Sequence, residues 1–316
     1  MNNVCVIGGS RYFGRRLIES LRDSGARVTV INRGSVPPPP GITHLTADRD
    51  DEKALGAAVG NREFDAVIDQ VCYTPYQAAI ARRVFGRRTS RYVMTSTMEV
   101  YDPATSELIP PAVPEVPVTE EAVDPASWPV PPGQPWHDPG RMEGVFGEAT
   151  RYAEGKRQAE AVFTRESPFA FVTVRSAHVL GIGARDFTGR LEHYVERILA
   201  GRPVDVHRDR FPTSFINDEE IAGLLFWAAG AEFTGAVNAS SHGELSVTGL
   251  CDLIAAETGR KADYRLVDGG EASPFSFDRH YAMGNGRAAR LGYAFSTTTD
   301  WLPKAIAMAI DLRKGT

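Results

Sequence analysis

Short apolar runs alternate with amphipathic stretches through the first half of the chain. The apolar runs predict six strands, at residues 3–8, 27–34, 42–47, 64–71, 91–97 and 169–176. Between the strands, apolar residues recur three and four positions apart and predict helices, at residues 13–25, 51–60, 75–85 and 147–166. Strands that alternate with helices form right-handed crossovers in a parallel sheet. The pattern therefore predicts an α/β fold built on a doubly wound parallel sheet.

The pattern changes near residue 182, where strong strands become rare. Helical spacing continues, at residues 188–200, 218–229, 246–258 and 299–313. We expect a first domain at 1–181 and a smaller, mixed α/β domain at 182–316. Segments at about 205–240 are expected to return to the first domain.

Proline interrupts this order twice. Residues 33–41 contain four consecutive prolines, and residues 102–139 contain eleven of the 21 prolines in the chain. Helix and sheet cannot run through such a density of proline, so we expect an insertion over residues 102–145. Its Trp128 and Trp136 favour an ordered flap over a floppy loop, because exposed tryptophan rings are costly. Whether the insertion covers a substrate is left open.

Composition excludes several classes of protein. The net charge is −5, which gives no general attraction to nucleic acid or to an anionic membrane. No apolar stretch approaches the roughly 20 residues of a membrane span, and no signal peptide is expected. Three scattered cysteines, Cys5, Cys72 and Cys251, predict neither a metal site nor a disulfide. We expect a cytoplasmic protein with no nucleic-acid or membrane partner.

Three glycines follow the first predicted strand. Gly8 and Gly9 end the apolar run, and Gly14 stands at the start of the first helical pattern. In a Rossmann-type fold, this arrangement points backbone amides at a pyrophosphate at the helix N-terminus. The alternative is a tight turn that needs positive φ. Arg11 stands where such loops often have a glycine, and its guanidinium could reach a phosphate from the side.

The end of the second strand bears on the choice of nucleotide. Asn32 stands where an acidic residue would bind the ribose 2′-hydroxyl of NAD, and Arg33 follows. Because Asn32 does not repel a 2′-phosphate, Arg11 and Arg33 together favour NADP over NAD. Alternatively, Arg33 stacks on adenine and Arg11 is solvent-exposed, which suits either cofactor.

Candidate chemistry lies in two segments, "STMEVY" at 96–101 and "YAEGK" at 152–156. Tyr152 and Lys156 are four apart and share a helix face. An ammonium there lowers the phenol pKa from about 10, so the tyrosine can pass a proton to or from an alcohol or carbonyl oxygen. Lys156 could also hold the cofactor ribose, and Thr97 could bind the reacting oxygen. Alternatively, Tyr152 and Lys156 are a surface pair.

Together these motifs resemble the extended short-chain dehydrogenases/reductases, the NAD(P)-dependent epimerase/dehydratase family, and most closely their atypical branch. "IGGSRYFG" resembles the glycine loop, "STMEVY" the Ser/Thr segment, "YAEGK" the catalytic pair and "VRSAHVLG" the strand before the substrate-binding part. The resemblance implies that Thr97, Tyr152 and Lys156 are catalytic. It implies cofactor contacts from Gly8, Gly9, Ser10, Arg11, Tyr12, Phe13, Gly14, Asn32, Arg33, Asp48, Arg49, Val71, Cys72, Tyr73, Thr95, Lys156 and His178.

The departures from the family pattern concern the substrate. Met98 stands where 4,6-dehydratases have an aspartate, which argues against elimination although Glu99 remains. His178 stands where many epimerases have a substrate-contacting asparagine; alternatively, backbone groups satisfy it. The arginines available for a diphosphate do not fall on the family's usual positions. The substrate candidates are Met98, Glu99, His178, Arg210 and Arg279.

The resemblance implies an oxidoreductase or epimerase that acts on a hydroxyl or keto carbon of a sugar-like substrate, either free or nucleotide-linked. One alternative is an NADPH-dependent ketoreductase of a small metabolite. Another is a non-catalytic, nucleotide-sensing or RNA-associated member of the family. A homodimer paired through the helix of Tyr152 would also resemble the family.

Overall fold

The computed structural model describes residues 1–165, 167–181, 188–268 and 272–314. The chain forms two compact units. The first comprises Met1–Pro110, Glu120–Ser176 and Ala222–Asn238. The second comprises Pro111–Thr119, Ala177–Ile221 and Ala239–Thr316. The first unit reaches Ser176 and includes the later segment Ala222–Asn238, while Pro111–Thr119 of the proline-rich insertion belongs to the second unit.

A seven-stranded sheet forms the centre of the first unit, in the order β10-β6-β5-β4-β1-β2-β3. Every pairing from β3 to β6 is parallel. The strands are β1 (Asn3–Ile7), β2 (Arg27–Asn32), β3 (Thr43–Thr46), β4 (Ala66–Asp69), β5 (Arg91–Thr97), β6 (Ala170–Ser176) and β10 (Gly235–Ala239). The predicted Rossmann-type fold is confirmed. Its strand order reverses between β1 and β4, where such sheets bind ligands beyond their carboxyl ends.

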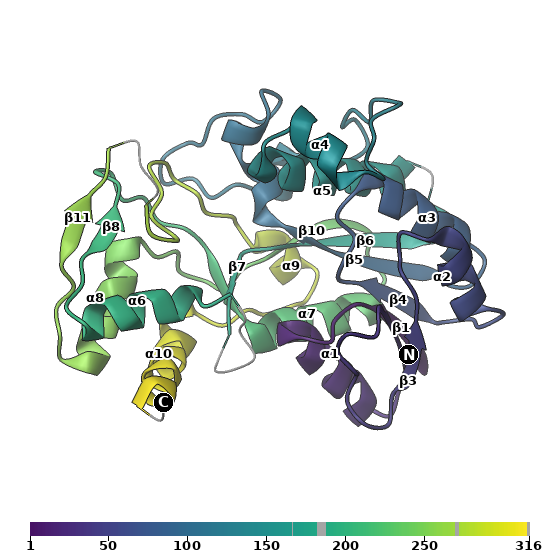
Figure 1. The fold of residues 1–316 in the computed structure, drawn as a ribbon, viewed down its shortest axis with the longest axis horizontal. Coiled ribbons are helices and arrows are strands. Elements are labelled where there is room, and N and C mark those ends of the chain that lie inside the picture. Colours follow the sequence, from purple (N-terminus) through teal and green to yellow (C-terminus); the bar gives the residue numbers. More distant parts are fainter. Residues whose placement is uncertain (166, 182–187, 269–271, 315–316) are drawn as a thin grey trace. The chain divides into compact units, whose positions relative to one another are not determined.

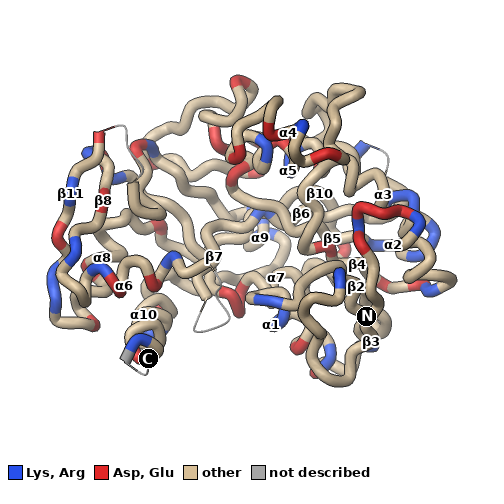
Figure 2. Tube along the Cα trace, in the orientation of Figure 1, with Lys and Arg blue, Asp and Glu red and all other residues tan. Residues whose placement is uncertain are grey.

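Helices cover both faces of this sheet, as Figure 1 shows. On one face lie α2 (Glu52–Val59), α3 (Pro75–Phe85) and α5 (Glu148–Arg165); on the other lie α1 (Tyr12–Asp23) and α7 (Asp218–Gly230). The ring of Tyr92 packs 4.8 Å from Phe163 and 4.9 Å from Phe169 in the core beneath α3 and α5. Acidic and basic residues stand side by side on α2 and α3 (Figure 2). Between these helices, Arg83 pairs with Glu52 at 2.8 Å.

The proline-rich insertion is ordered by its tryptophans. It contains 3-10 turns at Pro103–Thr105 and Glu120–Ala122 and one short helix, α4 (Pro139–Val145). Trp128 and Trp136 are buried, and their indole N–H groups donate to Glu154 and Gln158 of α5 at 3.1 and 3.0 Å. The expectation that both rings are packed rather than exposed is confirmed.

The second unit surrounds a separate apolar core, with residues such as Leu191, Leu250 and Ile306 at its centre. Its helices are α6 (Arg190–Leu199), α8 (Val247–Thr258), α9 (Gly286–Arg290) and α10 (Thr298–Lys314). Two parallel pairs join β7 (His178–Leu180) to β9 (Phe215–Asn217), and β8 (Val204–Val206) to β11 (Tyr264–Leu266). Within the described ranges of both units, no helix is long and apolar enough to cross a membrane.

Candidate active site

A tight turn joins β1 to α1. Gly8 and Gly9 have φ of 80° and 74°, a left-handed backbone that glycine adopts without strain. The Gly8 N–H donates to the carbonyl of Ile31 at 2.8 Å, which holds the turn against β2. Tyr12 opens the helix at φ of 52° with its ring buried, 5.5 Å from the ring of Phe13. The turn brings the first amides of α1 to the carboxyl end of β1, where a phosphate is favoured.

Gly14 lets α1 cross this turn closely. A Cβ atom on Gly14 would lie 2.4 Å from the Cα of Gly9 and 2.3 Å from Oε1 of Gln70. Gly8 also lies where a side chain has no room, because a Cβ there would lie 2.7 Å from a methyl group of Val71. Gln70, which the sequence analysis did not single out, reaches the turn because it directly follows β4. Its Nε2 is buried without a hydrogen-bond partner among the described residues.

We expect Gly14→Ala to lower the free energy of unfolding by about 1–3 kcal/mol, because the methyl group has no room against the backbone of Gly9. Nicotinamide nucleotide binding should fall with it, since the turn must open. Urea denaturation and titration calorimetry measure the two effects. Gly56→Ala in α2 is the control: its Cβ meets nothing within 4 Å, so this variant should gain up to about 1 kcal/mol. Equal behaviour of the two variants would contradict the close-approach argument.

Asn32 ties the end of β2 to the glycine turn. Its Nδ2 donates to Oγ of Ser10 at 2.7 Å, and its Oδ1 accepts from the Gly34 N–H at 2.7 Å. The side chains of Arg11 and Arg33 are exposed on either side. The strand end therefore presents an amide; the exposed Arg33 directly follows it, and the exposed Arg11 directly follows Ser10, its hydrogen-bond partner.

Arg49 is held in the core. Its Nη1 lies 2.7 Å from both carboxylate oxygens of Asp69, and Asp69 also accepts from the Tyr92 hydroxyl at 2.6 Å. Cys72 is fully buried nearby, and burial raises the pKa of its thiol to about 12. The side chains of Arg49 and Cys72 thus face inward, and a nucleotide contact by either would have to use the backbone. Asp48, in contrast, is exposed.

Helix α5 positions the candidate catalytic pair. Lys156 is 2% exposed, and its Nζ donates to the carbonyl of Thr95 at 2.8 Å. The same Nζ lies 4.4 Å from the ring centroid of Tyr73 and 5.9 Å from that of Tyr152. Burial lowers the pKa of the Lys156 ammonium to about 8. The structure thus brings Tyr73, Tyr152, Lys156 and Thr95 together, with both phenol rings partly exposed.

Gly155 makes this approach sterically feasible. A Cβ on Gly155 would lie 2.3 Å from the carbonyl oxygen of Tyr73 and 3.2 Å from the Trp136 ring. Glycine inside a helix costs about 1 kcal/mol relative to alanine, so its presence one residue before Lys156 needs a steric reason. The reason is that α5 closely contacts two other parts of the chain at Gly155. One is Tyr73, in the segment that follows β4, and the other is Trp136, in the insertion.

The carboxyl end of β5 supplies two threonines. Thr97 is buried, and its Oγ1 accepts from the Glu99 N–H at 3.2 Å. Thr95 has a buried Oγ1 without a hydrogen-bond partner among the described residues. Met98 is buried and Glu99 half-buried in the 3-10 turn Met98–Tyr101. Thr97 thus lies two residues beyond the carbonyl that binds Lys156, at the same end of the strand.

A buried ion pair supports this strand end. Arg175 of β6 and Glu160 of α5 are both fully buried, with Nη2 and Oε2 2.7 Å apart. Oε1 of Glu160 accepts from the Ser96 hydroxyl at 2.6 Å, directly beside Thr97. Nη1 of Arg175 donates to the Tyr101 hydroxyl at 2.8 Å. The pair therefore links α5, β5 and β6 just below the candidate catalytic residues.

A second buried arginine fastens the start of the insertion. Arg157 donates through Nε to the carbonyl of Val100 at 2.8 Å and through Nη2 to Oγ1 of Thr105. Its guanidinium also lies 5.1 Å from the ring of Trp128. Arg157, Arg175 and Glu160 were not among the predicted site residues, because sequence alone does not distinguish a buried charge from a surface one.

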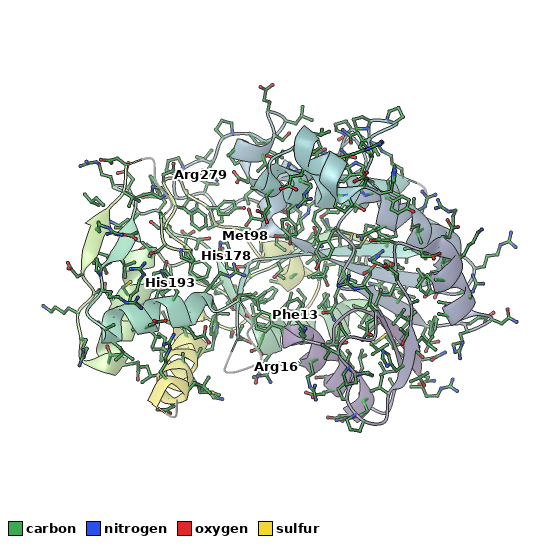
Figure 3. All side chains as sticks on the ribbon, in the orientation of Figure 1. Phe13, Arg16, Met98, His178, His193 and Arg279 are labelled. Carbon is green, nitrogen blue, oxygen red and sulfur yellow. The ribbon has the colours of Figure 1, made fainter. Side chains whose placement is uncertain are left out.

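The remaining candidates lie in the second unit. His178 is buried at the start of β7, among aromatic rings (Figure 3). Arg279 pairs with Asp278 at 3.1 Å and lies 5.5 Å from the ring of Tyr281. Arg210 is exposed, 5.9 Å from the ring of Tyr264. The two arginines thus have different neighbours: Arg279 lies near the ring of Tyr281, and Arg210 lies near the ring of Tyr264.

The first unit fits a nicotinamide dinucleotide. Cβ atoms at Gly8, Gly9 and Gly14 would collide with protein, so only glycine allows the tight turn that brings the first amides of α1 to the carboxyl end of β1. The buried Oγ1 of Thr95 lacks a hydrogen-bond partner among the described residues. The Lys156 ammonium has three N–H donors, and only one of them is needed for the bond to the Thr95 carbonyl.

Comparison with known proteins agrees with this geometry. Residues 4–212 match the family model described as the NAD dependent epimerase/dehydratase family. A 123-residue stretch is 29% identical to 2′-dehydrokanamycin reductase of Streptomyces kanamyceticus, covering 38% of this chain. The chain thus spans about a third (35%) of the length of that curated relative.

Solved structures share the fold over nearly the whole chain. The enzyme WbmH of Bordetella bronchiseptica, in complex with NAD+, is 18% identical, with a TM-score of 0.70 and 99% of each chain covered. UDP-glucose 4-epimerase of Thermotoga maritima, with UDP-glucose, is 15% identical, with a TM-score of 0.72 and 99% of each chain covered. Thermus thermophilus UDP-glucose 4-epimerase, with NAD, is 17% identical, with a TM-score of 0.67 and the same coverage.

Proposed function

The chain belongs to the NAD-dependent epimerase/dehydratase family, and we propose that it is an NAD(P)-dependent epimerase or reductase acting on a hydroxyl or keto carbon of a sugar-like substrate. The observation that carries this proposal is the position of Lys156. Its Nζ lies between the Thr95 carbonyl and the Tyr73 ring, one helical turn from Tyr152. An ammonium in that position supports acid–base chemistry by a tyrosine beside a nucleotide turn.

In this mechanism the bound nicotinamide supplies the acceptor or donor of a hydride. Tyr152 takes the proton from the substrate alcohol during oxidation and returns one to the carbonyl oxygen during reduction. Lys156 favours the phenolate through its charge, and the Thr95 carbonyl fixes the ammonium. The Thr97 hydroxyl donates to the reacting oxygen. Met98 is apolar and buried, which argues against an acid for elimination at that position.

The pKa of Lys156 gives a direct test. Because burial lowers this pKa to about 8, the ammonium is present below that pH and is lost as the pH rises through it. Turnover that depends on the ammonium should therefore decline above about pH 8. Carbon-13 NMR of the lysine ε-carbons should therefore resolve a titration near 8. The low titration must vanish in Lys156→Met. The absence of any titration near 8 would show that the Lys156 ammonium is not desolvated.

Two nucleotides are compatible with this proposal. Asn32 brings no negative charge to the end of β2, and exposed Arg11 and Arg33 favour NADP. The compared structures that name a cofactor name NAD, so they give the NADP preference no support. Denaturing the purified protein and identifying the released nucleotide by mass decides the matter. Release of tightly held NAD would favour redox-neutral epimerisation. A protein that releases no nucleotide, and that then binds NADPH more tightly than NADH, would favour a reductase.

A reductase is the second candidate because the curated relative is named a reductase of 2′-dehydrokanamycin. It differs from the epimerase in releasing the oxidised nucleotide after each turnover. Consumption of NADPH in proportion to product would favour it. Interconversion of substrate without net change in nucleotide would favour the epimerase.

A further inference from the structure

Helix α5 is buried on all sides around its centre. Every residue from 153 to 161 is buried, a stretch long enough to present every face of the helix. A helix that covers one face of a sheet ordinarily exposes its outer side to solvent. The proline-rich insertion instead packs on α5 through two buried tryptophans, Trp128 and Trp136.

The insertion contacts α5 at several successive turns. The indole N–H of Trp128 donates to Glu154 at 3.1 Å, and that of Trp136 donates to Gln158, one turn further on, at 3.0 Å. At the end of the helix, Arg165 donates to the backbone carbonyl of Trp128. The insertion is therefore attached along the same helix that carries the candidate catalytic pair.

Trp136 packs where α5 meets the segment that follows β4. The Tyr73 carbonyl and the edge of the Trp136 ring share the space that a side chain at position 155 would fill. A Cβ on Gly155 would lie 2.3 Å from that carbonyl oxygen and 3.2 Å from the ring. The ring of Tyr73 in turn lies 4.4 Å from Nζ of Lys156. A continuous run of contacts thus leads from Trp136, through Gly155 and Tyr73, to the Lys156 ammonium.

Trp128 belongs to the same insertion but has different neighbours. Its ring lies 5.1 Å from the guanidinium of Arg157, and its indole N–H bonds to Glu154. Arg157 donates to the carbonyl of Val100, just before the insertion. The contacts of Trp128 therefore fasten the insertion itself, whereas those of Trp136 reach the segment beside Lys156.

The surroundings of Lys156 show how the insertion can act on it. The charged and titratable groups around its ammonium are Arg49, Asp69, Cys72, Tyr73, Tyr152 and Glu160. Each of these six lies outside the insertion at 102–145. The insertion therefore acts on Lys156 by packing and by excluding water, and it adds no charge to this set. Burial lowers the pKa of Lys156 to about 8, so water that entered beside Gly155 would raise it.

We infer that Trp136 is a positioning residue: it seals the contact between α5 and the Tyr73 segment, and so holds the Lys156 ammonium, shielded from water, one turn from Tyr152. The kinetic consequence of this role rests on the proposed function. The role differs from that of a lid over the substrate. A lid acts once substrate is bound, whereas Trp136 acts on Lys156 in the free protein.

Carbon-13 NMR of the lysine ε-carbons in the free, full-length protein tests this role. In Trp136→Leu, we expect the pKa of Lys156 to rise from about 8 toward the ordinary lysine value, because water reaches the ammonium. Turnover should fall by at least about tenfold, and its decline at high pH should move to higher pH with the pKa. Trp136→Phe keeps a smaller ring beside Gly155 and should give a smaller rise, which preserves the test if the leucine variant does not fold.

Trp128→Leu is the matched control. It removes another buried indole from the same insertion and the same helix. Circular dichroism and urea denaturation should show a loss of stability in both leucine variants. The titration of Lys156 should nevertheless stay at the parent value in Trp128→Leu, because Trp128 packs on Arg157. A merely structural role for Trp136 would not produce this difference.

Three results would overturn the inference. They are a Lys156 titration that matches the parent in both Trp136 variants, an equal rise in Trp128→Leu, or a change in KM alone, which would mark a lid. The proposed function can fail separately. A protein that never turns over but shows the expected rise in Trp136→Leu keeps the positioning role and loses the enzyme. A protein that turns over equally well with and without Trp136 does the reverse.

Discussion

Tyr152→Phe is expected to lower turnover by about 10²–10⁴-fold while leaving nucleotide affinity within about twofold of the parent. The change removes one oxygen and keeps the ring, which lies 6.2 Å from Tyr73 and 5.9 Å from Nζ of Lys156. The Lys156 side chain keeps its bond to Thr95, so the ammonium stays in place without the Tyr152 hydroxyl to act on.

Steady-state kinetics and calorimetric titration of the nucleotide give the two readouts. Tyr76→Phe is the matched control, since its hydroxyl donates to the Asp50 carbonyl at 3.2 Å on the surface of the same unit. That variant should keep full turnover. Turnover that survives in Tyr152→Phe would refute the assignment of the proton donor. A parent protein that binds nucleotide but never turns over would favour the non-catalytic alternative.

Glu160→Gln is expected to cost about 3–5 kcal/mol in the free energy of unfolding, because it leaves the guanidinium of Arg175 buried without its counter-charge. The amide can still accept one hydrogen bond, but it cannot balance the charge. Chemical denaturation followed by tryptophan fluorescence measures the loss.

The control for this variant is Glu52→Gln on the surface. Glu52 pairs with Arg83 at a similar distance, 2.8 Å, but the two side chains are 44% and 53% exposed. Solvent screens such a pair, so its loss should cost no more than about 1 kcal/mol. Similar losses in the free energy of unfolding for the two variants would mean that water reaches Arg175 and screens its charge.

Long periodic elements were predictable because one side of each is continuously apolar. The strands from β1 to β6 and the helices α1, α3 and α5 lie within a few residues of their predicted ranges. The strands β7, β8, β9 and β11 have only three residues each, which is too short to show a period of two. Their pairing depends on contacts between segments far apart in the chain, so sequence patterns could not reveal it.

The site was predictable where spacing carries the chemistry. Tyr152 and Lys156 share a helix face by their separation alone, and the glycine turn follows from its place after a strand. Arg49 shows where this reasoning ends: the resemblance implied a cofactor contact, yet its side chain lies buried against Asp69. The partner that determines its position is 20 residues away.

Backbone carbonyls anchor the insertion on both sides of its exposed stretch. Arg157 donates to the carbonyl of Asp102, and Arg175 donates to the carbonyls of Glu120 and Val123. Carbonyl oxygens are the same for every amino acid, and residues 110–117 between these anchors are exposed. This stretch can therefore diverge in sequence or exchange segments with a relative while both attachment points persist, which makes it a natural place to graft a reporter peptide or diversify the protein.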